Sequence, residues 1–90
     1  MEMNKIGNRL FCTSDIERPV KDETKINYIQ IITSYNDLAH CYVSTMYMFD
    51  DYKNMIDVSE VRGPEVEYVE DKIPMYHKAM EEEMIEYFNK

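Results

Sequence analysis

Apolar side chains recur every three or four positions near the C-terminus of the chain, and this is the clearest periodicity in the sequence. Asp71 is a suitable N-cap, Pro74 is tolerated in a first helical turn, and no further helix breaker follows before Asn89. The pattern therefore predicts an amphipathic helix over residues 71–89, with the glutamates mostly on its polar side. The apolar positions on its other side are Ile73, Tyr76 or His77, Met80, Met84 and Phe88.

Three shorter stretches have the composition of β-strands. Residues 9–12 form a brief apolar run that predicts an edge strand, and residues 25–33 are dense in β-branched and aromatic side chains. The polar stretch between them, residues 13–24, predicts a loop. Residues 65–70, which follow the turn signal Gly63-Pro64, alternate acidic with apolar side chains and predict a half-exposed strand.

Residues 38–56 fit two different elements. As a helix, the stretch places apolar side chains at steps of three and four. As a strand, it presents every second side chain from Cys41 to Phe49 on one face, and residues 34–37 become the turn of a hairpin with the strand before it. The Cys, Tyr, Val, Thr and Phe residues in this stretch form strands more readily than helices, so we favour the strand.

Together these elements predict an α+β fold in which a small antiparallel sheet packs with the C-terminal helix. A chain of 90 residues is expected to make a single domain over residues 1–90, because it is too short to bury a second core. The apolar fraction of 44% is enough for a modest core. Small domains gain buried area by pairing, and interfaces favour Tyr and Met, so a homodimer is a reasonable expectation.

The net charge of −8 narrows the choice of partners. A strongly acidic chain repels nucleic acid phosphates and anionic lipid headgroups, so we expect no direct binding to nucleic acid or to a membrane surface. Basic proteins are the natural partners. The chain has no apolar run as long as a signal peptide or a membrane span, and its two cysteines are too few for a disulfide scaffold. We therefore expect a cytoplasmic protein with reduced thiols.

Nearly all of the net charge lies in residues 50–90. Like charges on a structured strand and helix repel one another and cost stability, so their retention invites a functional explanation. Alternate strand residues lie about 6.6 Å apart and helix residues four apart rise about 6 Å, close to the roughly 6–7 Å between neighbouring phosphates of DNA. The carboxylates that could imitate phosphates are Asp50, Asp51, Asp57, Glu60, Glu65, Glu67, Glu70, Asp71, Glu81, Glu82, Glu83 and Glu86.

A plainer interpretation is that these acids only form a solvated face that keeps a small protein soluble. The spacing does not separate the two interpretations, because any acidic strand or helix has the same repeat. Because the acids are concentrated in one half of the chain, the functional interpretation is as well supported as the plainer one.

Four side chains could bind a soft metal ion or serve as nucleophile and base, namely Cys12, His40, Cys41 and His77. Their spacing matches no zinc motif, and both thiols lie in apolar runs where a buried, unreactive cysteine is usual. Residues 50–57 lack the glycine and the spaced acids of a calcium loop, and the chain holds no glycine-rich phosphate loop or hydrolase motif. We therefore expect no metal, no cofactor and no enzymatic activity.

The chain as a whole, from Met3-Asn4-Lys5-Ile6-Gly7-Asn8-Arg9-Leu10-Phe11-Cys12 to its end, resembles small bacteriophage early proteins. Its size, its Tyr-, Asn-, Ile- and Lys-rich composition and its acidic second half are similar to phage DNA-mimic proteins, among them the Arn anti-restriction type of T-even phages. The resemblance implies a dimeric decoy that occupies the DNA-binding surface of a host protein in the bacterial cytoplasm. A restriction enzyme of the McrBC kind is the target it implies, with histone-like nucleoid proteins as a second class. Because such proteins share a charge layout and no motif, the resemblance assigns no residue.

Three hypotheses about function follow. The first is a DNA-mimic inhibitor whose acids in residues 50–90 compete with DNA for a basic cleft. The second is an adaptor or regulatory protein that docks through an apolar surface, while the acids serve only solubility. Its contact residues would be Tyr42, Met46, Met48 and Tyr52. The third is a small enzyme that uses Cys41 with His40 or His77.

Overall fold

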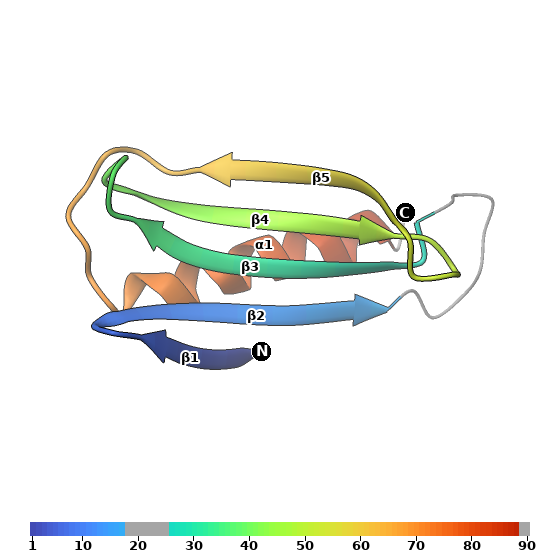
Figure 1. Ribbon diagram of the computed structural model, residues 1–90, viewed down its shortest axis with the longest axis horizontal. Helices are drawn as coiled ribbons and strands as arrows, with labels where there is room; N and C mark the ends of the chain where they lie inside the picture. Colours follow the sequence, from blue (N-terminus) through green and yellow to red (C-terminus); the bar gives the residue numbers. More distant parts are fainter. Residues whose placement is uncertain (18–25, 89–90) are drawn as a thin grey trace.

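The structure, a computed structural model, describes residues 1–17 and 26–88 and contains a five-stranded antiparallel sheet with one helix along one of its faces (Figure 1). The α+β fold predicted from the sequence is confirmed. The elements are β1 (Glu2–Ile6), β2 (Arg9–Glu17), β3 (Tyr28–Asn36), β4 (Cys41–Phe49), β5 (Met55–Arg62) and α1 (Lys72–Phe88).

Each strand pairs with the strand before it in the chain, so the sheet is a meander in the order β1-β2-β3-β4-β5. The turns between β1 and β2 and between β3 and β4 are short. Between β1 and β2, Gly7 takes a φ of 60°, which a residue without a Cβ adopts at little cost. Between β3 and β4, the Asn36 side-chain oxygen accepts hydrogen bonds from the backbone N–H groups of Leu38 and Ala39, both at 3.0 Å, and so caps the end of β3.

Side chains alternate between the two faces of the sheet, and α1 covers only one of them. Buried residues occupy every second position of β3, and their cross-strand partners on β2 and β4 share that face. In Figure 1, α1 lies behind β2, β3 and β4, the three strands against which it packs. The edge strands β1 and β5 contribute no buried side chain.

The core under α1 consists of two apolar clusters with a polar layer between them. One cluster, at the start of the helix, is made of Leu10, Cys12, Tyr35, Tyr42 and Ile73. The other, further along the helix, is made of Ile16, Ile29, Ile31, Met46 and Met80. The register places the buried polar residues between the two clusters on each element, and these residues are Ser14, Thr33, Ser44 and His77.

Within the described residues no element packs on the other face of the sheet, which we name the open face. It is formed by the side chains that alternate with the core positions, and most of these are half-buried or exposed, whereas Cys41 and Val43 are buried. Its apolar and aromatic members are Ile6, Phe11, Tyr28, Ile32, Val43, Tyr47, Phe49, Met55 and Val58.

Residues 41–49 form β4, which settles the ambiguity over residues 38–56 in favour of the strand. The predicted face running from Cys41 to Phe49 is the open-face side of that strand. The turn predicted at residues 34–37 is wrong by a few positions, since β3 continues to Asn36 and the turn follows it. The side chain of Asn36 sets that boundary by capping the turn.

Three other assignments from the sequence are wrong. Residues 9–12 do form a strand, but not at an edge of the sheet, because β2 pairs with β1 on one side and with β3 on the other. Residues 13–17, predicted as part of a loop, continue β2, because Ser14 and Ile16 alternate into the core and support pairing with β3. Residues 65–70 form no strand and instead connect β5 to α1. The side chains of Tyr35 and Tyr42 bond to their backbone, and the Tyr68 hydroxyl accepts a hydrogen bond from the backbone of Leu10.

The sequence patterns also do not predict β1 or β5. Both strands are almost wholly exposed, so neither carries the alternation of buried and exposed positions that marks a strand. Residues 18–24 of the predicted loop, the start of the predicted strand at Lys25, Asn89 and the side chain of Phe88 lie outside the described residues.

The C-terminal helix agrees with its prediction. Asp71 directly precedes α1, and Ile73, His77 and Met80 are buried against the sheet, while Met84 packs at the edge of the core. The choice left open between positions 76 and 77 is resolved by burial, since His77 is fully enclosed and Tyr76 is partly exposed.

Candidate functional site

Carboxylates gather at the end of the sheet where β2 and β4 finish and β3 and β5 begin. The register aligns Glu17 with Tyr28 and Tyr28 with Phe49, so the acids that follow β4 lie near those at the end of β2. Together they line a hollow of about 420 Å³. Its lining residues are Asp15, Glu17, Asn27, Tyr28, Asp50, Asp51 and Lys53.

The turn after β4 is built around Asp50. Its side-chain oxygen accepts hydrogen bonds from the backbone N–H groups of Tyr52 at 2.8 Å and Asn54 at 2.9 Å, and Lys53 takes a φ of 65° to close the turn. The hydrogen bond from the Asn54 backbone is the main cause that lowers the pKa of Asp50, and the one from Tyr52 adds to it. The carboxylate therefore stays ionised well into the acidic range.

The C-terminal half of α1 brings further acids to the same end. Met80 packs with Ile16 and Ile29 on the strand ends beside the hollow, which places this part of the helix under that end of the sheet. Glu82, Glu83 and Glu86 are exposed there, and Glu81 is half-buried. These glutamates lie on the side of the sheet that α1 covers, whereas Asp15 and Glu17 lie on the open face, and Glu83 also lines a separate hollow with Arg62. We name the whole region the acidic end, and its members are Asp15, Glu17, Asp50, Asp51, Glu81, Glu82, Glu83 and Glu86.

Apart from Asp71 at its N-cap, α1 lacks the placement of charge that favours helix stability. A helix gains stability from acids in its first turn and bases in its last turn, because its N-terminus is partially positive and its C-terminus partially negative. The first turn of α1 holds no acid and the last turn no base, whereas the glutamates lie in the C-terminal half. Helix stability therefore does not explain these glutamates.

The remaining predicted acids lie elsewhere. Asp57 and Glu60 are on β5, and their register partners Met48 and Thr45 put them on opposite faces of the sheet. Four more lie at the far end of the molecule from the hollow, in the connector between β5 and α1, and they are Glu65, Glu67, Glu70 and Asp71. The structure thus brings only part of the predicted set together.

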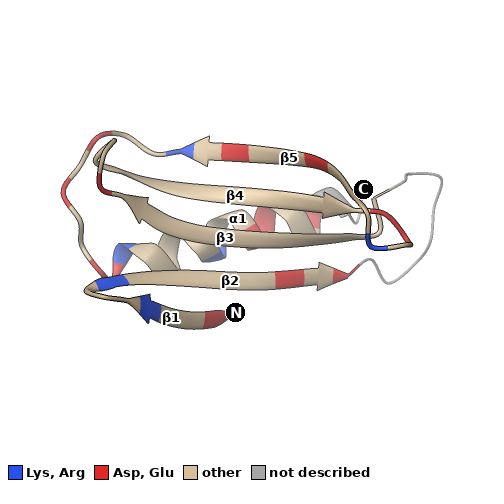
Figure 2. Ribbon diagram, in the orientation of Figure 1, with Lys and Arg blue, Asp and Glu red and all other residues tan. Residues whose placement is uncertain are grey.

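Three ion pairs lie toward that far end. Lys5 contacts Glu70 at 2.7 Å, Arg9 contacts Asp37 at 2.7 Å, and Arg62 contacts Glu60 at 3.3 Å. In Figure 2, Lys and Arg occur mostly at the end where β1 meets β2 and the helix begins. Among the described residues, the bases therefore lie mostly toward the far end, where Asp37, Glu60 and the four connector acids also lie. The longest dimension of the molecule is 41 Å.

Asp15 and Glu17 are members of the acidic end that the sequence interpretation missed. They lie in the stretch taken for a loop and in the half of the chain with little net charge. The alternation of Cys12, Ser14 and Ile16 is the signal that could have placed them on a strand.

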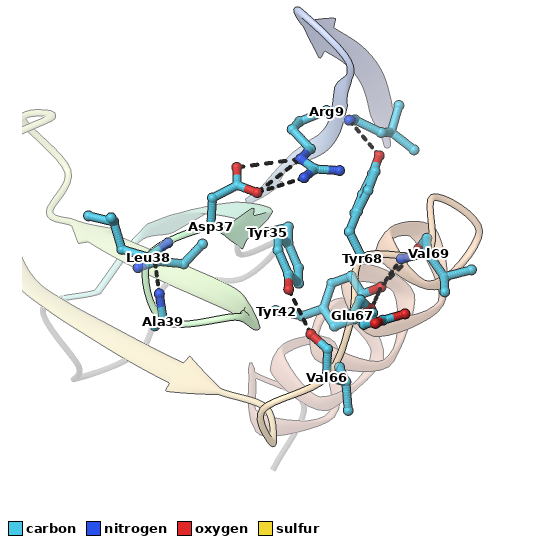
Figure 3. Close-up of polar contacts among 12 residues, drawn as sticks. Arg9, Tyr35, Asp37, Leu38, Ala39, Tyr42, Val66, Glu67, Tyr68 and Val69 are labelled. Atoms are coloured by element: carbon cyan, nitrogen blue, oxygen red, sulfur yellow. Dashed lines mark hydrogen bonds and ion pairs between the residues drawn. The ribbon is translucent and has the colours of Figure 1, made fainter.

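Tyrosine hydroxyls hold the connector at the far end (Figure 3). Tyr35 donates a hydrogen bond to the Val66 carbonyl at 2.6 Å, and the Tyr68 hydroxyl accepts one from the Leu10 N–H at 2.9 Å. The Tyr42 hydroxyl bonds both the N–H and the carbonyl of Val69.

A cation completes this arrangement. The Arg9 guanidinium lies over the Tyr68 ring, 4.2 Å from its centre, while it pairs with Asp37. The connector is thereby fixed although it forms no regular element, and this end of the molecule has a structural role.

His77 lies in the polar layer of the core. Its two ring nitrogens are 2.7 Å from the Ser14 hydroxyl and 2.8 Å from the Thr33 hydroxyl, and Thr33 is 2.8 Å from the Ser44 hydroxyl. A serine beside a histidine also occurs in hydrolases, but here both groups are buried beneath the helix, where a substrate does not reach them. We assign this network a structural role.

The thiols of Cys12 and Cys41 are free and buried. Burial raises the pKa of Cys12 and so disfavours its reactive thiolate form. In the part of the chain that the structure describes, no hydrogen bond joins either thiol to a histidine, and no group of three or more His, Cys, Asp or Glu side chains is placed to hold a metal ion.

The apolar contact surface predicted for an adaptor needs correction. Tyr42 and Met46 are core residues beneath α1, and Met48 packs against the core, so they cannot form an exposed surface together with Tyr52. They face the helix because β4 places every second side chain on that face. The exposed apolar surface of the sheet is the open face instead.

Helix α1, the helix of the described residues, is not long and apolar enough to cross a membrane. Comparison of the chain with protein-family models, with curated protein sequences and with solved structures finds no match.

Proposed function

We propose that this protein is a non-catalytic inhibitor that presents its acidic end to the basic, DNA-binding surface of a host defence protein and so competes with DNA. The mechanism is occupancy, in which no bond is made or broken. A restriction endonuclease of the McrBC kind is the first target to test, because the resemblance to phage DNA-mimic proteins implies it. Histone-like nucleoid proteins form the second class.

The gathering of carboxylates at the acidic end, around a hollow whose described lining includes one base, Lys53, is the observation that carries this proposal. An acidic protein whose charge serves only solubility has no reason to gather acids from a strand, a turn and a helix at one end. Nor does it have a reason to place Glu86 in the last turn of α1, where the helix dipole disfavours an acid. Both features are expected if the acidic end binds cations on a partner.

The spacing of these acids supports the same proposal. Asp15 and Glu17 are alternate residues of one strand, roughly 6.6 Å apart along it, and Glu82 and Glu86 are separated by about 6 Å of helix rise. Neighbouring phosphates of a DNA strand lie at a similar spacing, and Arg or Lys side chains that bind phosphate also bind carboxylate.

Competition with DNA is the direct test. A purified McrBC-type endonuclease and a purified histone-like protein, each immobilised, would be offered the protein over a range of salt concentrations and in the presence of increasing duplex DNA. We expect binding that weakens steeply with salt and that DNA displaces. The proposal fails if neither target binds at low salt, or if DNA and the protein occupy a target together.

Charge reversal at the two ends of the molecule supplies a matched control. The pair Glu82→Lys and Glu86→Lys changes the acidic end, while the pair Glu65→Lys and Glu67→Lys makes the same change in net charge on exposed acids of the connector. We expect the first pair to weaken binding by about a hundredfold and the second by less than about fivefold. Equal effects would indicate that net charge alone matters.

The open face favours a second candidate function, that of an adaptor bound through apolar contacts. Phe11, Ile32 and Tyr47 remain partly exposed on a sheet that nothing in the described chain covers. Such binding would change little with salt, and replacement of Ile32 would abolish it while charge reversal at Glu82 and Glu86 would not.

A further inference from the structure

Strand β5 ends the sheet, and its outer edge is paired with no other strand of the described residues (Figure 1). The hydrogen bond from the Gly63 N–H to the Tyr42 carbonyl, at 2.8 Å, fixes which residues of β5 bond to β4. Because bonded and non-bonded pairs alternate in an antiparallel ladder, the register turns the backbone groups of the intervening residues outward. The residues that present their N–H and C=O groups along the edge are Val58, Glu60 and Arg62.

The two edges of the sheet differ in how well they are protected against further pairing. β1 has only five residues and carries Lys5, and a short edge strand with a lysine discourages the addition of another strand. β5 has eight residues and contains neither Lys nor Pro. At Val58 the N–H donates a hydrogen bond to the Asp57 carboxylate at 2.8 Å, and an incoming strand would take the place of that carboxylate. The β5 edge is therefore the one suited to receive a partner.

The hollow that Glu83 and Arg62 line is a groove of about 140 Å³ beside this edge, between β5 and α1. It exists because α1 packs on β2, β3 and β4 and leaves β5 uncovered. Its volume is below the roughly 300–1,000 Å³ of small-molecule sites and suits a single apolar side chain. Its apolar walls are Val61 of β5, Tyr42 of β4, and Tyr76, Ala79 and Met80 of α1.

The edge and the groove are placed to bind one extended chain together. Val61 lies on the helix side of β5, since its register partner Ser44 is buried beneath α1. A strand added to β5 lays every second side chain on that same side, and a side chain beside Val61 can lean across it into the groove. The occupant that uses both features is an extended polypeptide segment, whose backbone continues the ladder while an apolar side chain fills the groove.

Charge selects a segment that carries bases. Glu83 lines the groove, and Asp57 lies four residues before Val61 on the same side of β5. Arg62, the base at the groove, is already paired with Glu60 at 3.3 Å, so it adds little repulsion toward another cation. The net charge of −8 attracts a basic chain over a longer range. We therefore expect Lys or Arg on the same side of the segment as its apolar residue.

We propose that the edge of β5 accepts an extended, basic segment of another protein as a sixth strand, with one apolar side chain of that segment seated in the groove between β5 and α1. The backbone groups of the edge supply affinity, and the groove and its acids supply selectivity. This inference does not rest on the proposed function, because its binding groups are the β5 backbone and the groove, and competition with DNA plays no part in it.

A symmetric synthetic peptide, acetyl-Lys-Thr-Lys-Thr-Leu-Thr-Lys-Thr-Lys-amide, is the probe. Its leucine and lysines share one side of a strand and its threonines the other, and its symmetry lets it pair with β5 in either direction. By fluorescence anisotropy of the labelled peptide, we expect saturable binding in the micromolar range. Replacement of the leucine by threonine, or of the lysines by glutamate, should weaken binding at least about tenfold. No binding up to about 1 mM, or equal binding of the threonine version, overturns the proposal.

Methylation of the peptide backbone tests strand pairing directly. In an added strand, alternate N–H groups point toward β5 and the others point away. N-methylation of one alternate set, either the threonines or the leucine and lysines, should abolish binding, whereas methylation of the other set should be tolerated. Two sets with equal effects would show that the peptide does not pair as a strand and would overturn the proposal.

Two variants at one position test the edge itself. Glu60→Pro removes an outward N–H, whereas Glu60→Ala keeps that N–H and makes the same change of charge. Because the Glu60 N–H does not bond to β4, proline is tolerated there and the far-ultraviolet circular dichroism should stay unchanged. We expect Glu60→Pro to bind the peptide at least about tenfold more weakly than Glu60→Ala does. Equal binding by two well-folded variants would mean that the edge is not used.

Filling the groove is a separate test. Ala79 is exposed on α1 and lines the groove, and leucine forms helices almost as well as alanine, so Ala79→Leu blocks the groove without disturbing the fold. It should weaken binding of the peptide at least about tenfold. Met75→Leu, at an exposed position of the same helix outside the groove, should leave binding unchanged. Unchanged binding by Ala79→Leu overturns the assignment of the groove.

A second copy of the chain is the other strand donor available to this edge. Sedimentation equilibrium of the parent protein and of Glu60→Pro distinguishes the two occupants. We expect Glu60→Pro to leave the oligomeric state unchanged, because the edge receives a strand of another protein. A dimer of the parent that Glu60→Pro dissociates would overturn the proposed occupant.

Discussion

His77 is the residue on which the polar layer of the core depends. A neutral imidazole donates from one ring nitrogen and accepts at the other, and the hydroxyls of Ser14 and Thr33 can rotate to match either tautomer. A protonated ring must donate from both nitrogens and carries a charge under the helix. Burial is the largest cause that lowers the pKa of His77 from its ordinary value of 6.5, and the nearby Glu81 carboxylate only partly opposes it.

The stability of the protein should therefore depend on pH through His77. The unfolded chain binds a proton near pH 6.5 while the folded protein resists it, so the free energy of unfolding is at its full value above about pH 6.5 and falls as the pH drops below it. Urea unfolding at intervals from about pH 7.5 to 5 measures this loss. The hydrogen-bond network around His77 includes no charged side chain of β2, β3 or β4. Glu81 is the carboxylate that influences the pKa of His77, so it is left unchanged in the variants used for this test.

Two histidine variants separate this effect from general acid denaturation. His77→Gln removes the titrating group and should flatten the dependence over this range, at the cost of lower stability throughout. His40→Gln changes an exposed turn residue and should preserve the dependence. A pH dependence that survives in His77→Gln would assign it to other groups.

Among the elements, α1 is held by a few large side chains, and Ile73 is the one that contributes most to the first cluster. Ile73 is fully buried between Leu10, Cys12 and the Tyr35–Tyr42 pair. Ile73→Ala removes these contacts and leaves a cavity, so we expect it to lower the free energy of unfolding by about 2–5 kcal/mol. The midpoint of urea unfolding, with an unchanged slope, measures the loss.

Ile85→Ala on the same helix is the control. Ile85 is 43% exposed and lies on the outer side of α1, so its replacement should change stability by less than about 0.5 kcal/mol. Similar losses for the two variants would mean that the helix does not dock through the face seen in the structure.

An element could be predicted when its own residues carry all the signals that identify it, and could not when it depends on contacts with other elements. Helix α1 carries both its apolar side and its start signal at Asp71, so its sequence suffices to identify it. The edge strands β1 and β5 have no buried side chains, so their sequences show no alternation of apolar and polar residues. Their pairing with β2 and β4 is seen only in the folded structure. Residues 65–70 have the alternation of a strand but do not pair with a strand. The hydroxyls of Tyr35 and Tyr42 form hydrogen bonds with their backbone instead.

The acidic end could be predicted only in part for the same reason. The glutamates of α1 and the pair Asp50-Asp51 each form a cluster in the sequence, so the distribution of charge along the chain was enough to predict them. Asp15 and Glu17 join them only because the meander returns the end of β2 to the end of β4. Glu65 and Glu67 follow the same sequence signal but are carried to the far end by the direction of β5.

At the scale of the whole molecule, the crowding of acids at one end should make stability respond to salt. Like charges at that end repel in the folded state, and Glu82 with Glu86 forms a like-charge pair one helical turn apart. Raising sodium chloride from about 0.01 M to 0.3 M screens this repulsion, so we expect the melting temperature to rise by a few degrees.

The double variant Glu82→Gln with Glu86→Gln should melt higher than the parent at low salt and respond less to added salt. The same substitutions at Glu65 and Glu67, in the connector, should alter the salt response less. Thermal unfolding followed by circular dichroism makes the comparison, and a melting temperature that falls with salt would show that attractive pairs dominate instead.

The meander order of the sheet also bears on how quickly the chain finds its structure. Every strand pairs with the strand that precedes it in the chain, so no pairing step has to close a loop that contains another strand, and the entropy lost in each closure is limited. The docking of α1 onto Leu10, Cys12 and Ser14 is the contact of greatest sequence separation among the elements. We therefore expect successive hairpins to organise early and the helix to lock them together last, with the rate-limiting barrier set by that final closure.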